Sequence, residues 1–124
     1  MIGVDSFGHP LVIGSWPERD PQWSGVKPSD LLMLAAASCS SYDVNMILDK
    51  QKEPLQGLEV TCTGTQEDEP PYHFTSIHLH YTVRGAVNPK KVERAIQLSE
   101  EKYCSVTNTL KHGVKITSDY VIVK

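Results

Sequence analysis

The feature that most constrains the fold is a long apolar segment over residues 31–48. Pro28 precedes it at a position suited to the first turn of a helix, and Asp30 lies where the helix dipole favours an acid. Apolar or small residues occupy nearly every face of this helix, as in helices buried at the centre of a protein. Polar residues inside it, such as Asp43 and Asn45, argue against a membrane span. The segment therefore predicts a long, buried central helix.

Period-two alternation of apolar residues indicates the strands. Residues 1–16 predict a first hairpin that turns near residues 7–10, and a loop rich in proline and charge follows it. Residues 58–63 and 76–83 alternate as two half-buried strands on either side of a polar turn, which predicts a second hairpin. Residues 114–123 are predicted to form a closing strand.

Two shorter helices are predicted between the second hairpin and the closing strand. Asn88 is a suitable N-cap with Pro89 at the first helical position, and a second helix is expected to restart at Ser105 as N-cap and end near Gly113. The resulting order, β-β-α-β-β-α-α-β, is that of an α+β fold with a largely antiparallel sheet. A chain of 124 residues is expected to be a single domain, residues 1–124.

Composition limits the partners and the compartment. A net charge of −3 gives no electrostatic reason to expect nucleic acid or an anionic membrane as a partner. The first residues lack the basic and apolar regions of a secretory signal. Three cysteines are an odd number and argue against a disulfide framework. A cytoplasmic protein is expected, in which a disulfide is usually transient and catalytic.

The three cysteines have different sequence environments. Cys39 and Cys104 each lie at or in a predicted helix among small residues, where a thiol has little structural advantage over alanine. Two such thiols indicate redox chemistry if the fold brings them together, although each could equally be a small core residue. Cys62 alternates with Leu58 and Val60 on one strand face, so it is interpreted as a buried apolar residue.

A cysteine is nucleophilic as the thiolate, so a reactive one needs a positive neighbour or a helix N-terminus. Cys104 directly precedes the predicted N-cap Ser105, where backbone amides would favour a thiolate. Cys39 lies far inside its own helix, so a partner from elsewhere would have to activate it.

Three histidines offer a weaker candidate site. His78 and His80 lie on the same face of a predicted strand, and His73 lies a few residues upstream. No cysteine or carboxylate at ligand spacing completes a metal site with them, so an exposed polar strand face is the simpler interpretation. Phosphate-binding loops and nucleophile elbows are absent. The sequence thus predicts neither a metal nor a cofactor.

Two segments carry a resemblance to a known family. Residues 25–39, Gly-Val-Lys-Pro-Ser-Asp-Leu-Leu-Met-Leu-Ala-Ala-Ala-Ser-Cys, resemble the central-helix signature of the OsmC/Ohr family, the osmotically inducible and organic hydroperoxide resistance proteins. Residues 98–110 are similar to its second-cysteine segment. The predicted order of elements between them also agrees with an OsmC-like fold.

The resemblance implies an intertwined homodimer with active sites at the subunit interface. It implies a thiol-dependent peroxidase in oxidative or osmotic stress defence. Cys39 would attack an organic hydroperoxide and become a sulfenic acid, and Cys104 would then form a disulfide with it. A small dithiol or a lipoylated protein would restore the thiols.

The chain departs from the family pattern around the first cysteine. Family peroxidases have a glutamate after the helix-opening proline, which holds an arginine beside the thiolate, whereas Ser29 follows Pro28 here. Arg19 is the arginine of the N-terminal region, and its context does not match. These departures keep open an alternative function: a non-catalytic, dimeric OsmC-like stress or ligand-binding protein with redox-sensing or vestigial cysteines.

Overall fold

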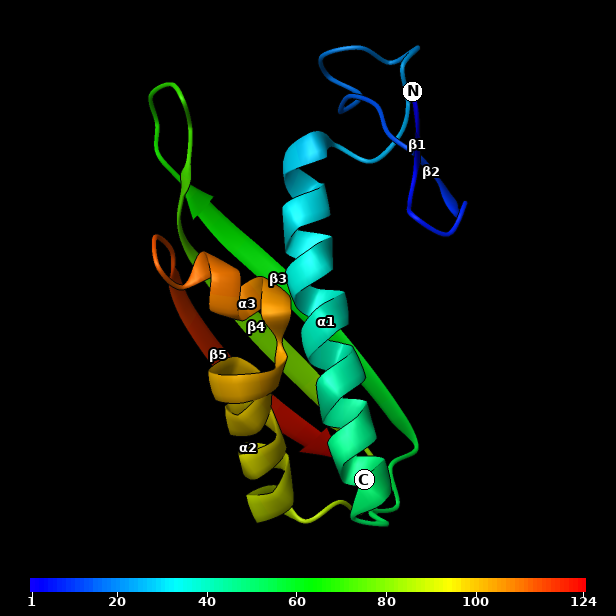
Figure 1. Ribbon diagram of the computed structural model, residues 1–124, viewed down its shortest axis with the longest axis vertical. Helices are drawn as coiled ribbons and strands as arrows, with labels where there is room; N and C mark the ends of the chain where they lie inside the picture. The colour runs from blue at the N-terminus through cyan, green and yellow to red at the C-terminus, as the bar shows by residue number, and fades with distance from the viewer. The chain divides into compact units, whose positions relative to one another are not determined.

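The structure, a computed structural model, describes residues 1–124 and has nine elements of secondary structure (Figure 1). Their order confirms the predicted β-β-α-β-β-α-α-β sequence and the α+β fold class, with one additional π-helical turn between the last two helices. The chain divides into two compact units, residues 1–34 and residues 35–124, which are described separately.

The first unit is built on a short hairpin. β1 (Ile2–Val4) pairs antiparallel with β2 (Pro10–Val12), as the sequence predicted. Asp5 closes the turn, because its Oδ1 atom accepts hydrogen bonds from the backbone N–H groups of Phe7 and His9, each at 2.8 Å. Gly8 adopts a φ of 86°, a left-handed conformation that favours glycine.

Helix α1 (Pro28–Lys50) is the long helix predicted from the apolar segment. Four residues that follow one another at four-residue intervals along one face of the helix are fully buried: Ala36, Ser40, Val44 and Leu48. The opposite face carries Tyr42 and Met46, whose exposed fractions are 67% and 39%. In the single chain α1 is therefore buried along one face and exposes apolar side chains along another.

By length and composition alone, α1 could also cross a membrane, since it has 23 residues and a mean hydropathy of 1.4 in its most apolar window. The core helix of a globular protein passes the same test. Contacts in the second unit favour that interpretation, because Ser40 is fully buried against Cys104 and Asp43 accepts a hydrogen bond from Ser99.

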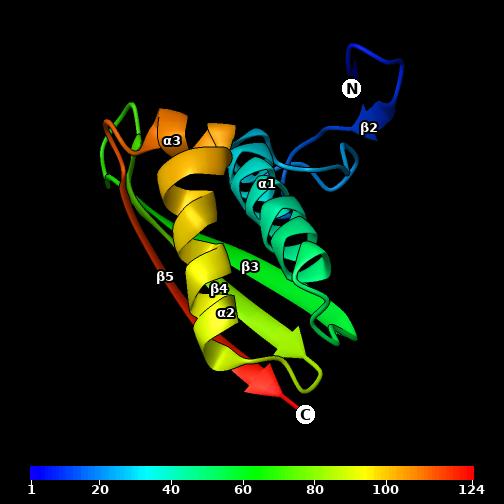
Figure 2. The ribbon, with the colours of Figure 1, turned by 60° about the horizontal axis from the view of Figure 1, so that its bottom comes forward.

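The second unit contains a three-stranded mixed sheet of β3 (Gly57–Gln66), β4 (Phe74–Arg84) and β5 (Lys115–Val123). Central strand β4 pairs antiparallel with β3 and parallel with β5. One face of β4 is fully covered, with Ile77, Leu79, Tyr81 and Val83 each at most 1% exposed. The helices lie against this face of the sheet (Figure 2).

A helical connection joins the parallel strands β4 and β5, as parallel pairing requires. It consists of α2 (Pro89–Leu98), the π-helical turn η1 (Ser99–Tyr103) and α3 (Ser105–Leu110). Helix α2 buries Val92, Ala95 and Ile96. The predicted restart at Ser105 is confirmed, but the N-cap residue is Cys104 rather than Ser105.

Asn88 caps helix α2, because its side chain accepts a hydrogen bond from the Lys90 backbone N–H at 3.0 Å. Asn88→Ala is expected to lower the free energy of unfolding by about 1 kcal/mol, the usual cost of a lost N-cap. Chemical denaturation measures this change. Asn88→Asp serves as the control because it keeps the capping oxygen, and equal losses in both variants would contradict the capping role.

Candidate functional site

The two candidate cysteines come from separate parts of the second unit. Cys39 lies in the middle of α1, directly before Ser40 of its buried face. Cys104 lies at the junction of η1 and α3, where the chain leaves the helical conformation with φ −76° and ψ 106°. This single extended residue turns its side chain into the protein, and Cys104 is fully buried.

The fold brings Cys39 and Cys104 together with Asp43. Their ligand-type atoms, two thiol sulfurs and a carboxylate oxygen, all lie within 4.8 Å of one another. Cys39 and Asp43 are four residues apart on α1 and therefore share one helix face. Cys39 and Asp43 are half-buried, whereas Cys104 is closed off from solvent.

The sulfur of Cys104 is surrounded by hydrogen-bond donors. The Thr107 backbone N–H donates to Cys104 Sγ at 3.4 Å, so the thiol itself caps α3. The buried Ser40 hydroxyl donates to the same sulfur at 3.7 Å. Donors of this kind stabilise a thiolate.

The two thiols have opposite pKa shifts. Burial raises the pKa of Cys39, and its hydrogen bond to Cys104 raises it further. Burial also acts to raise the pKa of Cys104, but the Thr107 side chain and amide, the Cys39 thiol and Ser40 together outweigh burial and lower it. The first proton lost by the pair therefore comes from Cys104, and Cys39 keeps its proton and donates it toward Cys104.

Besides burial and Cys104, which raise the pKa of Cys39, hydrogen bonds from the Val106 backbone and the Ser105 side chain act to lower it. Within the first unit, the ammonium of Lys27 lies 4.9 Å and the guanidinium of Arg19 lies 5.8 Å from the centre of the Trp16 ring.

Further polar groups surround the thiol pair. Ser99 Oγ, which is fully buried, donates to Asp43 Oδ2 at 2.9 Å and fixes the carboxylate. Tyr81 of β4 lies beneath the site, where burial raises its pKa well above the usual range and Cys104 and Asp43 add smaller effects in the same direction. A hydrogen bond with Ser40 acts to lower the pKa of Tyr81, and the buried Glu100 Oε1 has no hydrogen-bond partner.

Sequence reasoning missed Ser40, Asp43, Ser99 and Thr107. Helical spacing could have identified Asp43, because it follows Cys39 by one turn of a helix that was itself predicted. The positions of Ser99 and Thr107 relative to the thiols depend on the π-helical turn η1, which has no comparable sequence signal.

Cys62 lies outside this site, on β3 opposite Leu79 of β4. It is half-buried rather than fully buried. Burial raises the pKa of its thiol. Its interpretation as an apolar strand residue agrees with this environment.

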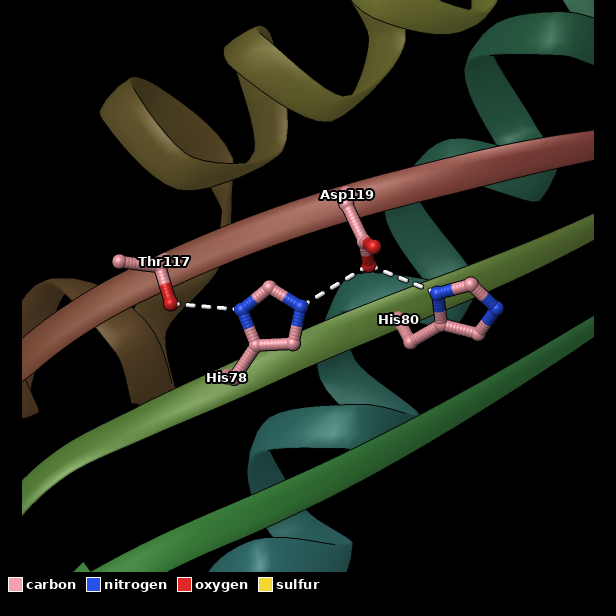
Figure 3. A network of polar contacts seen from close by, with 4 residues as sticks. All are labelled: His78, His80, Thr117 and Asp119. Atoms are coloured by element: carbon pink, nitrogen blue, oxygen red, sulfur yellow. Dashed lines mark hydrogen bonds and ion pairs between the residues drawn. The ribbon is translucent and has the colours of Figure 1, made fainter.

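The histidines form a separate polar network on the other face of the sheet (Figure 3). His78 Nε2 and His80 Nδ1 both contact Asp119 Oδ1, at 2.9 and 2.7 Å, and His78 Nδ1 contacts the Thr117 hydroxyl at 2.6 Å. Hydrogen bonds from His80 and His78 lower the pKa of Asp119. His73 lies instead beside Glu67, at 3.8 Å, so the three histidines do not gather into one site.

Replacement of Thr107 tests what lowers the pKa of Cys104. Thr107→Val keeps the side-chain volume but removes the hydroxyl that lowers the pKa of Cys104, so this pKa is expected to rise toward 9.0. At a fixed pH below 9.0 less thiolate then remains, and the thiolate absorbance measured during a pH titration shifts to higher pH.

Thr109→Val is the matched control on the same helix, because the Thr109 hydroxyl bonds to Ser105 O at 2.7 Å and contacts neither thiol. An unchanged titration in Thr107→Val, or an equal shift in both variants, would contradict the assignment of Thr107.

Comparison with known proteins agrees with this fold. Residues 20–119 match the family described as OsmC-like protein, so the chain belongs to the OsmC-like family. Protein YhfA of Escherichia coli strain K12 is 36% identical over 125 residues, which cover 99% of this chain and 90% of YhfA.

Solved structures share the fold. A hypothetical protein from Aquifex aeolicus VF5 superposes with a TM-score of 0.80 at 26% identity, over 100% of this chain and 96% of the other. A protein of Legionella pneumophila described as an organic hydroperoxide resistance protein OsmC superposes with a TM-score of 0.71 at 20% identity, over 95% and 85% of the two chains. At that identity the likeness extends to the fold alone.

Proposed function

We propose that this protein is a thiol-dependent peroxidase that reduces organic hydroperoxides in stress defence, with Cys39 and Cys104 as its catalytic residues. The observation that carries the proposal is the direct pairing of the two thiols, which lie within 4.8 Å of each other and share a hydrogen bond. A disulfide needs a sulfur separation of about 2 Å, so modest side-chain movement joins them.

The exposure of the two thiols supports different roles for them. Cys39 is half-buried and can meet a substrate, whereas Cys104 is fully buried and can meet only Cys39. Cys39 therefore attacks the peroxide, and Cys104 resolves the product. The pKa of Cys104 is lowered, so Cys104 is the thiol of the pair that more readily supplies the thiolate for attack on oxidised Cys39.

The reaction balances in three steps. The Cys39 sulfur attacks the outer oxygen of the hydroperoxide, the O–O bond breaks, and the Cys39 proton passes to the departing alkoxide, which leaves as an alcohol. Cys39 is oxidised to a sulfenic acid. The Cys104 thiolate then attacks the Cys39 sulfur and displaces hydroxide, which takes a proton from solvent and leaves as water as the disulfide forms. A small dithiol or a lipoylated protein reduces the disulfide by exchange and is itself oxidised.

A groove of about 400 Å³ next to Asp43 supports an organic substrate. Met46, Ile47, Leu98 and Tyr103 give it a mainly apolar lining. Such a lining would bury the hydrocarbon part of an alkyl hydroperoxide. Hydrogen peroxide has no hydrocarbon part and would gain no binding energy from apolar burial.

The test oxidises the reduced protein with one equivalent of cumene hydroperoxide. Mass spectrometry is expected to find a disulfide between Cys39 and Cys104 with Cys62 still reduced, and dithiothreitol is expected to restore both thiols. Hydrogen peroxide at the same concentration is expected to react more slowly. Retention of all three thiols after exposure to cumene hydroperoxide would contradict the proposal.

Exposed apolar residues on α1 support a homodimer as the working form. Tyr42 and Met46 lie one turn apart on a face of the helix that the second unit leaves exposed. A second copy of the chain would cover this face in a cytoplasmic dimer. Sedimentation at micromolar concentration measures the mass, and a monomer there would contradict this assembly.

The raised pKa of Cys39 favours one alternative, a non-catalytic stress or ligand-binding protein with redox-sensing cysteines. A protonated thiol reacts slowly with peroxide, so such a protein would form the disulfide without sustained turnover. The two functions differ in a single measurement: continuous dithiol-dependent loss of hydroperoxide over many turnovers identifies the peroxidase.

A further inference from the structure

The reduced thiol pair and Asp43 form a cluster with the composition of a metal site. Two thiolates and a carboxylate suit Zn²⁺, which binds sulfur at about 2.3 Å and oxygen at about 2.0–2.2 Å. A tetrahedron with these bond lengths has edges of roughly 3.4–3.8 Å. The three atoms here lie within 4.8 Å of one another, so contraction by about 1 Å would bring them to bonding distance.

The surroundings of the cluster favour deprotonated ligands. Cys104 Sγ already accepts hydrogen bonds from the Thr107 N–H at 3.4 Å and from Ser40 at 3.7 Å. Ser99 Oγ holds Asp43 Oδ2 at 2.9 Å and leaves the other carboxylate oxygen available. A hydrogen bond that orients a ligand from behind is a common feature of zinc sites and contributes to their affinity.

The cluster is accessible to an ion from solvent. Asp43 lines the groove beside α1, and both Asp43 and Cys39 are half-buried rather than enclosed. Three protein ligands leave the fourth position of a tetrahedral ion for water, as in zinc sites with an open coordination position. Tyr81 Oη and the unpartnered Glu100 Oε1 provide further buried polar groups in this region.

We propose that the reduced protein binds one thiophilic divalent cation, Zn²⁺ or a similar ion, through Cys39, Asp43 and Cys104. Binding displaces the remaining thiol protons to solvent. The bound form holds both sulfurs, so it excludes peroxide attack at Cys39; this consequence alone rests on the proposed peroxidase function. Because oxidation joins the two sulfurs, the disulfide form loses the ion.

The experiment titrates the reduced, full-length protein with Co²⁺ under anaerobic conditions and then adds Zn²⁺. We expect one Co²⁺ per chain, an intense near-ultraviolet thiolate-to-cobalt absorption, and loss of this absorption as Zn²⁺ displaces Co²⁺. Asp43→Asn and Cys39→Ser are expected to weaken binding about tenfold or more. Asp49→Asn, an exposed acid on the same helix, is the matched control and is expected to bind as the wild type does.

Two results would overturn the site. Absence of the thiolate absorption would exclude the cysteines, even if Co²⁺ bound elsewhere, for example at His78 and His80. A full absorption with unchanged affinity in Asp43→Asn would exclude the three-ligand arrangement. The titration contains no peroxide, and hydroperoxide turnover is measured with a chelator, so a failure of either proposal is recognised independently of the other.

Discussion

Cys39→Ser is expected to reduce dithiol-dependent consumption of an alkyl hydroperoxide by at least about 10³-fold. A serine hydroxyl cannot form the sulfenic acid, and Cys104, fully buried, cannot replace Cys39 as the attacking group. The initial rate of hydroperoxide loss measures this effect, with dithiothreitol or a dihydrolipoyl compound as reductant. Retained activity would exclude Cys39 as the attacking thiol.

Cys62→Ser is the matched control for this experiment. It makes the same chemical change at a half-buried strand position that lies outside the thiol pair. The rate of hydroperoxide consumption by Cys62→Ser is expected to stay close to that of the wild type. A similar loss in both variants would show that the effect of Cys39→Ser came from the fold and not from the chemistry.

Leu48→Ala is expected to have the largest effect on stability, a loss of about 2–5 kcal/mol in the free energy of unfolding. Leu48 is fully buried near the end of α1 and belongs to the same face as Ala36, Ser40 and Val44. Its truncation removes apolar contacts and leaves a cavity between the helix and its neighbours. Urea denaturation followed by circular dichroism measures the change.

Leu11→Ala makes the identical substitution at a leucine on β2 that is 43% exposed. Its cost is expected to stay below about 1 kcal/mol, because little apolar surface returns to water. If the two leucine variants lost equal stability, the buried face of α1 would not be a main contributor to the core.

Much of the fold could be predicted from local patterns. The alternation in residues 76–83, the apolar segment of α1 and the Asn88–Pro89 helix start are all signals within a few residues, and each element appears where it was expected. The parallel pairing of β5 with β4 could not be predicted in this way, because strand direction depends on how the helical connection packs.

The site was predictable only in part. Small neighbours and a family resemblance identified Cys39 and Cys104, but the partners of their thiols come from α1 and α3, which are far apart in the sequence. The expected N-cap Ser105 was wrong by one residue, because the thiol of Cys104 fills the capping position. Sequence reasoning looked for a cation near Cys39, whereas the structure stabilises charge on the other sulfur through uncharged donors.

The helical connection between β4 and β5 has a consequence for the stability of the oxidised protein. It places Cys104 far along the chain from its neighbour Cys39, so a bond between the two sulfurs would close a loop that contains most of the second unit. A crosslink over a loop of this length restricts the unfolded chain and stabilises the folded one by about 4 kcal/mol. The oxidised protein would then resist heat and proteases better than the reduced one. Each reduction of the disulfide would lower the stability of the unit that holds the two sulfurs together.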